Sequence, residues 1–278
     1  MGSPLRLTTV ASDEDAGWSV VRNAFDDVEH TLTRFSPTSP LSELNREASP
    51  SASLRPVPGL LARALLLAWR AYRMSDGIFD PRIIGALEAA GERAGVTLPD
   101  SPRGLSPGEP WLTLARSPWR AALTAPVDLG GIGKGLALRI AARALEGRGI
   151  DSFLLEAGGD VVAGRPPPNE AGWRLSIEHP QQRDPAAVIE IADAAVATSS
   201  TAVHPAHLID PRTLQPAATE LSSLTVIGPD PAWAEVWSKV GFIGGIDALG
   251  CMASIWVTTD GAVGARRAAE PRIVWRRA

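Results

Sequence analysis

The stretch from Pro126 to Asp160 constrains the fold of this chain more than any other part of its sequence. An apolar segment ends at Val127–Asp128, where we expect a strand to end, and four glycines then surround Lys134. The apolar periodicity of residues 136–145 predicts a helix after this glycine-rich turn. A second strand is expected at Ser152–Glu156, followed by another glycine turn. The stretch therefore predicts a strand, a tight turn, a helix and a second strand.

The glycine-rich turn around Lys134 is a candidate site for a phosphate or pyrophosphate. Glycine lets the backbone approach a ligand closely, a helix N-terminus offers N–H donors, and the lysine adds a positive charge. The spacing fits neither common phosphate loop, because Asp128 stands where a P-loop needs glycine and Leu136 where G-x-G-x-x-G needs its third. Plain packing is about as common an explanation for such a turn, so both alternatives stay open.

Composition limits the class of protein. The chain has 278 residues, 45% of them hydrophobic and 21% charged, which is typical of a soluble globular protein. A net charge of −4 gives no electrostatic footprint for nucleic acid, and no apolar run is long enough to predict membrane insertion. The single cysteine, Cys251, excludes an internal disulfide, suits a reducing compartment and has apolar neighbours that predict a buried thiol. We therefore expect a cytoplasmic protein.

The order of the predicted elements indicates an α+β fold with N-terminal helices followed by a strand-rich second half. A first strand is expected within residues 1–10, and helices at 13–34, 57–75 and 82–94. The Ser/Pro-rich segment Phe35–Asn45 is too short and punctuated to be a domain linker. This order favours one core rather than a doubly wound sheet. The other expected strands lie at 111–114, 121–123, 173–178, 188–191, 195–199, 223–227, 254–259 and 273–275, with a helix from about Pro231.

Two histidines and a hydroxyl-rich strand end are further candidates for chemistry. His204 and His207 are three residues apart, but no cysteine or third histidine lies nearby, which disfavours a zinc site. His207 is better placed as a general base, although a structural histidine is the commoner alternative. The hydroxyls of Thr198 and Ser199 could bind phosphate oxygens, and a cap or turn explains them equally well.

Taken together, these segments resemble the ApbE family, the FAD:protein FMN transferases. The resemblance runs in order over nearly the whole chain, from an M-G-T-like start at Met1 and an S-x-L-x-x-x-N-like segment within Phe35–Asn45. Any one of the motifs is a weak signal, whereas five in the right order are a strong one. They are S/T-D-G-x-F-D-P at 75–81, V-D-L-G-G-I-A-K-G at 127–135, A-G-G-D at 157–160, A-T-S-G at 197–200 and H-I-I-D-P-R-T-G at 207–214.

The resemblance implies a single ApbE-like (T-fold-like) domain over residues 1–278. It implies that FAD and a divalent ion, Mg²⁺, are bound, and that FMN moves from FAD to a Ser or Thr hydroxyl of an acceptor flavoprotein with release of AMP. By family position, His207 is the proposed base, and the carbonyl of Gly131 and the side chain of Glu235 would hold the metal. The implied FAD contacts are Phe35, Gly77, Ile78, Phe79, Asp128, Gly131, Lys134, Gly158, Gly159, Thr198, Ser199, Leu208 and Lys239.

The chain departs from the family pattern at several positions. Arg139 stands where the helix after Lys134 should carry Asp, and Ser200 and Leu214 replace glycines. Glu235 and Lys239 occupy the places of Asp and Thr in the metal-binding D-A-x-x-T, and a protonated lysine cannot ligate Mg²⁺. Their i, i+4 spacing instead predicts an ion pair of about 0.2–0.5 kcal/mol on a helix surface. Two alternatives to transfer therefore stay open, an FAD-binding protein without transferase activity and an FAD pyrophosphatase.

Overall fold

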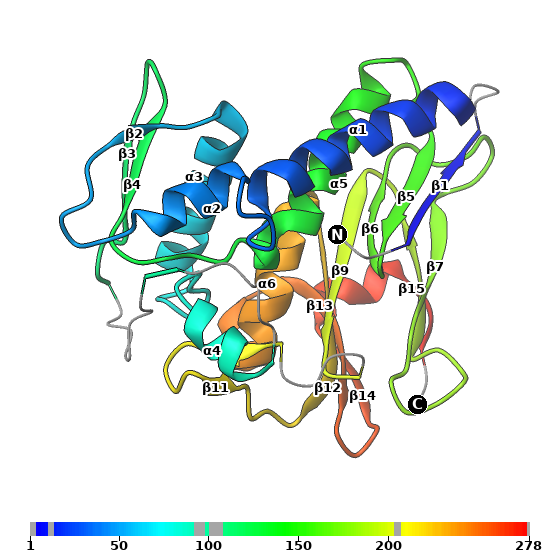
Figure 1. The fold of residues 1–278 in the computed structure, drawn as a ribbon. Coiled ribbons are helices and arrows are strands. Elements are labelled where there is room, and N and C mark those ends of the chain that lie inside the picture. Colours follow the sequence, from blue (N-terminus) through cyan, green and yellow to red (C-terminus); the bar gives the residue numbers. More distant parts are fainter. Residues whose placement is uncertain (1–3, 11–13, 92–97, 100–107, 203–206, 277–278) are drawn as a thin grey trace. The chain divides into compact units, whose positions relative to one another are not determined.

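The computed structural model describes residues 4–10, 14–91, 98–99, 108–202 and 207–276. The backbone contacts divide the chain into two compact units that alternate along the sequence (Figure 1). The first, here called the sheet unit, consists of residues 1–26, 134–205 and 219–278. The second, the helical unit, consists of residues 27–133 and 206–218. The expectation of a single domain over residues 1–278 stays a prediction.

The sheet unit is built on a seven-stranded antiparallel sheet in the order β1-β5-β6-β9-β12-β13-β14. A smaller antiparallel sheet has the order β15-β8-β7. The strands of the large sheet are β1 Leu5–Thr9, β5 Phe153–Ala157, β6 Asp160–Ala163, β9 Ala194–Ser200, β12 Leu221–Gly228, β13 Ala253–Thr258 and β14 Val263–Ala265. Those of the smaller sheet are β7 Trp173–Ile177, β8 Ala187–Ile191 and β15 Ile273–Arg276.

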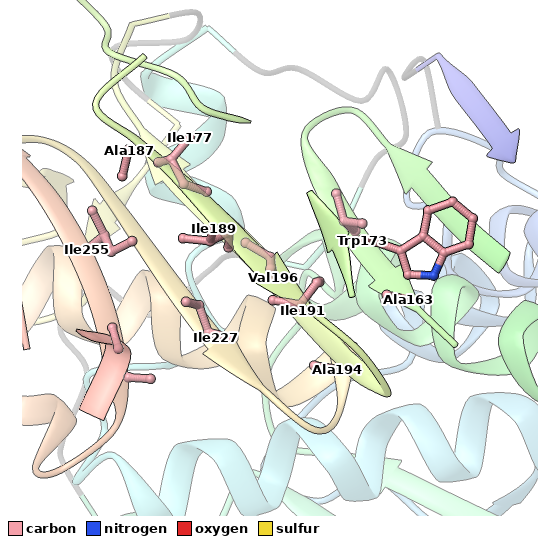
Figure 2. Packing of buried hydrophobic residues seen from close by; sticks show 13 residues of the cluster. Ala163, Trp173, Ile177, Ala187, Ile189, Ile191, Ala194, Val196, Ile227 and Ile255 are labelled. Carbon is pink, nitrogen blue, oxygen red and sulfur yellow. The ribbon is translucent and has the colours of Figure 1, made fainter. Parts of the chain in front are cut away.

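Side chains of both sheets form one apolar core (Figure 2). In the large sheet, Val161 of β6 and Val196 of β9 belong to this core. Because side chains alternate between the faces of a strand, their neighbours Asp160 and Ala197 point to the opposite face. Helix α6 (Pro231–Gly244) packs against β9 and β12. Ile246–Leu249 and Arg267–Arg272 form 3₁₀ turns in this unit.

The predicted glycine turn between β5 and β6 is confirmed. Ala157 pairs with Asp160, so the hairpin has a two-residue loop. Its residues Gly158 and Gly159 have φ values of 55° and 90°. A two-residue loop with both φ values positive is the turn that matches the twist of antiparallel strands, and it favours glycine at both positions. Asp160 consequently stands at the first position of β6.

Two predictions around Lys134 are wrong. Val127–Asp128 is not part of a strand, and the glycines lie within the first turns of helix α5 (Gly130–Glu146) instead of a loop before it. Packing explains one of these glycines. A Cβ on Gly135 would lie 2.5 Å from the carbonyl oxygen of Pro231 and 2.6 Å from the Cα of Ala232. Gly135 therefore allows α5 to approach the start of α6, which outweighs the low helix propensity of glycine.

The helical unit contains helices, a three-stranded sheet and a hairpin. Helix α1 (Glu14–Leu32) ends in it, and its other helices are α2 Pro40–Arg46, α3 Gly59–Met74 and α4 Ile84–Ala89. The sheet has the order β2-β4-β3, formed by Arg55–Pro56, Arg120–Leu123 and Leu112–Ala115, and the hairpin pairs β10 Ile209–Asp210 with β11 Gln215–Pro216.

Helix α2 (Pro40–Arg46) begins in the Ser/Pro-rich segment, for which the sequence predicted no helix or strand. Ser39 caps it, because its Oγ accepts a hydrogen bond from the N–H of Ser42 at 3.0 Å, and Pro40 occupies the first helical position. Serine followed by proline is a common start of a helix.

The prediction that the thiol of Cys251 is buried is wrong, because its side chain is exposed. In the described part of the chain, no helix is both long and apolar enough to cross a membrane.

Candidate functional site

Four charged residues of the sheet unit form a compact group, here called the lysine cluster. Lys134 lies near the start of α5, Asp160 begins β6, and Glu235 and Lys239 are one turn apart on α6. The Nζ of Lys134 lies 2.6 Å from Oδ2 of Asp160, and the Nζ of Lys239 lies 3.1 Å from Oε1 of Glu235. The only two lysines of the chain are therefore both held by carboxylates in one cluster.

Backbone donors complete the contacts of both carboxylates. The N–H of Thr198 donates to Oδ1 of Asp160 at 3.1 Å, and the N–H of Gly135 donates to Oε2 of Glu235 at 2.8 Å. The side chains of Asp160 and Glu235 are only 3% and 1% exposed, whereas those of Lys134 and Lys239 are 27% and 20% exposed. The carboxylates thus form the buried layer of the cluster, and the lysines keep some access to solvent.

The electrostatics of the cluster favour a charged Lys134. Burial opposes the ammonium form and is the largest single effect, but Asp160 and Glu235 together raise the pKa of Lys134 above its ordinary value. For Asp160, burial is again the largest effect and raises its pKa, Glu235 raises it further, and Lys134 and Lys239 act in the opposite direction. Asp160 is therefore influenced by all three of the other charges, so the four residues act as one electrostatic unit.

The hydroxyls near the cluster are used in packing. Ser199 is buried, and its Oγ lies 2.9 Å from Oγ of Ser238, which donates to the carbonyl oxygen of Glu235 at 2.9 Å. The Oγ1 of Thr198 lies 2.9 Å from Oγ1 of Thr225 on the neighbouring strand. These bonds fix α6 on β9 and β9 beside β12. A role of Thr198 and Ser199 toward phosphate oxygens stays a prediction.

Arg139, one of the departures from the family pattern, joins α5 to α6. Its guanidinium contacts the carboxylate of Asp230, the N-cap residue of α6. Asp230 also accepts a hydrogen bond from the N–H of Trp233 at 3.0 Å. A basic residue at this position therefore positions the helix that carries Glu235 and Lys239.

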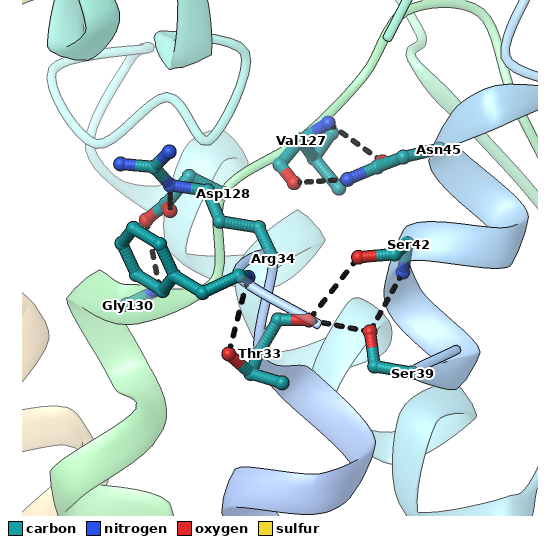
Figure 3. Close-up of polar contacts among 9 residues, drawn as sticks. Thr33, Arg34, Ser39, Ser42, Asn45, Val127, Asp128 and Gly130 are labelled. Atoms are coloured by element: carbon teal, nitrogen blue, oxygen red, sulfur yellow. Dashed lines mark hydrogen bonds and ion pairs between the residues drawn. The ribbon is translucent and has the colours of Figure 1, made fainter. Parts of the chain in front are cut away.

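In the helical unit, Asp128 lies in a hydrogen-bonded network (Figure 3). Its Oδ2 accepts from Nε of Arg34 at 2.7 Å, and its Oδ1 accepts from the N–H of Gly130 at 2.8 Å. Its own N–H donates to the carbonyl oxygen of Pro81 at 2.7 Å. Both N–H and C=O of the preceding Val127 are bonded to the side chain of Asn45 at 2.9 Å. Asp128 and Asn45 thus fix the backbone that leads into α5.

Phe35 is an exposed aromatic ring beside this network. Its side chain is 57% exposed, and the guanidinium carbon of Arg34 lies 4.4 Å from the ring centroid. Such a ring offers a flat apolar surface backed by a cation.

The segment of residues 75–79, which holds three predicted FAD contacts, forms a compact turn. Its Gly77 has a φ of 80°, and the N–H of Phe79 donates to Oγ of Ser75 at 2.9 Å. Ile78 lies within this turn, with its N–H bonded to the carbonyl oxygen of Ser75.

The predicted base, His207, precedes the β10–β11 hairpin and is partly buried. Leu208 beside it is buried and accepts a hydrogen bond from the N–H of Ala217 at 2.8 Å. Leu214, which stands where the family pattern has glycine, has a φ of 57°, a backbone conformation that costs a non-glycine residue about 1 kcal/mol or more. His204 lies outside the described residues.

The predicted site residues fall into two sets, one in each unit. Lys134, Gly158, Gly159, Thr198, Ser199, Glu235 and Lys239 belong to the sheet unit, and Phe35, Gly77, Ile78, Phe79, Asp128, Gly131, His207 and Leu208 to the helical unit. Within the sheet unit, the N–H of Gly135, next to Lys134 in the chain, is bonded to Glu235, which in turn pairs with Lys239. Asp160 was missed as a site residue, although its position directly after the predicted glycine turn was the available signal.

Comparison with known proteins identifies the family of this chain. The profile of the ApbE family matches residues 1–255. The chain belongs to the ApbE family. The computed structure superposes on the flavin transferase ApbE of Vibrio cholerae with a TM-score of 0.82 and 21% sequence identity, over 98% of this chain and 96% of the other. For the ApbE protein of Thermotoga maritima the TM-score is 0.83 at 21% identity, over 100% and 97%. These similarities confirm the α+β fold with its strand-rich second half.

Relatives with higher identity align over shorter segments. An FAD:protein FMN transferase of Klebsiella pneumoniae is 33% identical over 121 residues, which are 40% of this chain and 35% of the relative. The match therefore spans about a third of the length of that relative. An FAD:protein FMN transferase of Haemophilus influenzae is 25% identical over 244 residues, or 80% of this chain and 70% of the relative.

Proposed function

We propose that this ApbE-family chain is an FAD:protein FMN transferase, which moves FMN from FAD to a Ser or Thr hydroxyl of an acceptor flavoprotein and releases AMP. Family membership over residues 1–255 supports this function, as do the names of the relatives. The structural observation that carries the proposal is the lysine cluster, in which Lys134 pairs with Asp160 and Lys239 pairs with Glu235. Two ammonium groups in one place suit a ligand with the charge of a diphosphate.

In the proposed reaction, the acceptor hydroxyl oxygen attacks the phosphorus of the FMN half of FAD. The bond from that phosphorus to the bridging oxygen breaks, AMP leaves with the bridging oxygen, and a phosphoester joins FMN to the acceptor. His207 takes the proton of the attacking hydroxyl. Lys134 and Lys239 stabilise the negative charge on the diphosphate oxygens, which is the main contribution a protein makes to phosphoryl transfer.

The helical unit would supply the contacts to the flavin and the backbone before α5. Phe35 offers an exposed ring, and by their family positions Asp128 and Gly131 would contact FAD. Gly77, Ile78, Phe79 and Leu208 would complete this part of the FAD site, and Gly158, Gly159, Thr198 and Ser199 would lie toward the diphosphate. The single cysteine agrees with a reducing compartment, so we place the reaction in the cytoplasm.

The test is to incubate the purified chain with FAD and a flavin-free acceptor domain that carries the free threonine to which FMN is to be attached. We expect AMP and covalently bound FMN in equal amounts, measured by chromatography and by flavin fluorescence of the denatured acceptor. AMP and free FMN without acceptor labelling would identify a pyrophosphatase. Bound FAD without any AMP would identify a binding protein, and absence of FAD binding would overturn the proposal.

His207→Asn separates binding from chemistry. We expect FAD affinity within a few-fold of the parent and transfer slower by about 10²-fold or more, the usual size of a general-base effect. His30→Asn is the matched control, because His30 is an exposed histidine near the end of α1. A parallel loss of FAD binding and transfer in His207→Asn would mark His207 as structural, and an unchanged rate would remove it from the mechanism.

A further inference from the structure

The divalent ion that the family resemblance implies does not fit the residues at Glu235. Mg²⁺ requires oxygen ligands in near-octahedral geometry. Both oxygens of Glu235 already contact nitrogens, Oε1 the ammonium of Lys239 and Oε2 the N–H of Gly135. A dication on Oε1 would have to displace the ammonium or lie beside it, and like charges at that distance repel strongly. Among the described residues, no three His, Cys, Asp or Glu side chains are grouped to hold a metal.

Asp160, the second buried acid of the cluster, offers no alternative. Its Oδ2 is in close contact with the ammonium of Lys134, and its Oδ1 accepts from the N–H of Thr198. The two carboxylates are therefore balanced by two ammonium groups without any metal. Arg139 of α5 and Asp230, the N-cap residue of α6, are themselves paired. The two negative and two positive charges of the lysine cluster thus balance one another without a metal ion.

The layering of the cluster directs its positive charges outward. The carboxylate side chains are almost fully buried, while the side chains of Lys134 and Lys239 are 27% and 20% exposed. A lysine ammonium has three donors and acts as a compact point charge that needs no fixed ligand geometry. An anion that reaches the cluster from solvent can therefore contact the lysines without breaking the contacts of Asp160 and Glu235.

We propose that Lys239 takes the place of the divalent cation in this chain, so that the diphosphate of FAD is bound by two ammonium groups and without Mg²⁺. Glu235 then acts as a positioning residue that holds Lys239, and the N–H of Gly135 holds Glu235. The choice of diphosphate as the ligand rests on the proposed function. The exclusion of a metal rests on the contacts of Glu235 and Asp160 and can be tested without flavin.

The first experiment measures metal binding with Mn²⁺ as the probe and no FAD present. The parent should leave the electron paramagnetic resonance signal of free Mn²⁺ unchanged, because Lys239 neutralises Glu235. The double variant Glu235→Asp with Lys239→Thr restores the oxygen ligands of the family pattern and should deplete that signal. Stoichiometric Mn²⁺ binding by the parent, lost in Glu235→Gln, would overturn the proposal whatever the fate of FAD.

The second experiment measures FAD affinity by titration of flavin fluorescence, once in EDTA and once in excess Mg²⁺. We expect the dissociation constant of the parent to change less than two-fold between the two buffers. Lys239→Met should weaken binding at least ten-fold in EDTA, and Lys239→Arg should restore most of it. Arg143→Met is the control, because it removes one positive charge from an exposed position of α5 and should change the affinity less than two-fold.

The possible failures can be told apart. If Lys239→Met does not fold, the double variant Glu235→Gln with Lys239→Met takes its place. It removes the ammonium without leaving Glu235 as an unpaired buried acid, and its FAD affinity is compared with that of the parent in the same way. A ten-fold loss of parent affinity in EDTA, or unchanged affinity in these Lys239 variants, overturns the role of Lys239. A parent that binds no FAD in either buffer overturns both the proposed function and the diphosphate role of Lys239, and the Mn²⁺ experiment then still decides whether the cluster excludes a metal.

Discussion

The Asp80–Arg82 ion pair and the lysine cluster differ in how far their positive charges are exposed to solvent. In the helical unit, Asp80 binds Arg82 through Nε at 3.0 Å, Nη2 at 2.7 Å and the backbone N–H at 2.9 Å, and the two side chains are 2% and 4% exposed. In the sheet unit, the acids are equally buried but their lysine partners are not. The arginine pair directs its charge into the protein, whereas the lysine cluster keeps its charge accessible.

The difference follows from the chemistry of the two side chains. A guanidinium binds both oxygens of a carboxylate in a fixed plane, so a neighbouring pair can satisfy itself completely. The same tripeptide Asp-Pro-Arg occurs twice, at 80–82 and 210–212, and forms the same three contacts each time. Such arginine pairs satisfy themselves locally, whereas partly exposed lysines above buried acids are the better candidates for binding a ligand.

The largest effect is expected for Arg82→Ala. Removing one partner of a buried pair leaves Asp80 without its counter-charge, which costs about 3–5 kcal/mol of the free energy of unfolding. Arg82 also donates to the hydroxyl of Tyr72 at 3.3 Å, so further contacts are lost. Urea denaturation followed by circular dichroism measures this. Arg82→Lys should recover less than half, because lysine cannot form the fork, and full recovery by lysine would contradict the comparison.

Lys134→Met tests the lysine cluster. It should lower the free energy of unfolding by about 3 kcal/mol, the low end for a broken buried pair, because Lys134 is partly exposed. The loss should depend on pH. Without Lys134, the pKa of Asp160 rises further above its ordinary value of 3.8. A raised folded pKa contributes stability that is present below the unfolded pKa and is lost as pH rises through the folded pKa.

The difference between parent and Lys134→Met should therefore be small near pH 4 and largest at neutral pH. Urea denaturation at several pH values checks it, with Arg143→Met as the control for loss of one positive charge on α5. A difference that is independent of pH between 4 and 7 would mean that Asp160 is not the group left without its partner.

A pair of glycine variants on α5 tests whether the lysine cluster depends on close helix packing. Gly135→Ala should destabilise by about 2 kcal/mol, because the new Cβ would lie 2.5 Å from a backbone oxygen of Pro231 and force α6 to shift. Gly133→Ala is the matched control, since a Cβ there meets nothing within 4 Å, and it should stabilise by about 0.5–1 kcal/mol. Thermal denaturation measures the stability of both variants. Equal changes in stability for Gly135→Ala and Gly133→Ala would refute the packing explanation.

The sequence predicted the parts of this structure that depend on neighbouring residues. The β5–β6 turn follows from Gly158 and Gly159, and the pairing of Glu235 with Lys239 follows from helical spacing. The prediction placed that pair on a surface, but Glu235 is buried, because α6 packs on β9 and β12. Local spacing fixes which side chains meet on a helix, but not which helix face is covered.

The missed features depend on contacts between distant residues. The N–H of Gly135 is bonded to a carboxylate 100 residues away, and this contact, with the close approach of Pro231, places the glycines in a helix that their propensity disfavours. Asp160 gains its importance from Lys134 and α6, neither of which is its neighbour in sequence. Helix α2 is different, since Ser39 and Pro40 gave a local start signal.

The smallest loss of stability is expected for Asp210→Asn, in the second Asp-Pro-Arg. Its Asp210 is 13% exposed but its Arg212 is 55% exposed, so solvent screens much of the attraction. Burial is the largest single effect on the pKa of Asp210 and raises it, but the hydrogen bonds and charge of Arg212 together lower it below the ordinary value of 3.8. A lowered folded pKa contributes stability that is present above the unfolded pKa and is lost as pH falls through the folded pKa.

Asp210→Asn should therefore cost about 1 kcal/mol at pH 7, and the difference from the parent should shrink as pH falls below about 4. Urea denaturation at pH 7 and pH 3 measures both values. Asp80→Asn, measured alongside, should cost several times more at pH 7, because the same contacts are buried there. Equal costs for the two variants would mean that exposure of the arginine does not set the strength of these pairs, and the contrast with the partly exposed lysines would lose its physical basis.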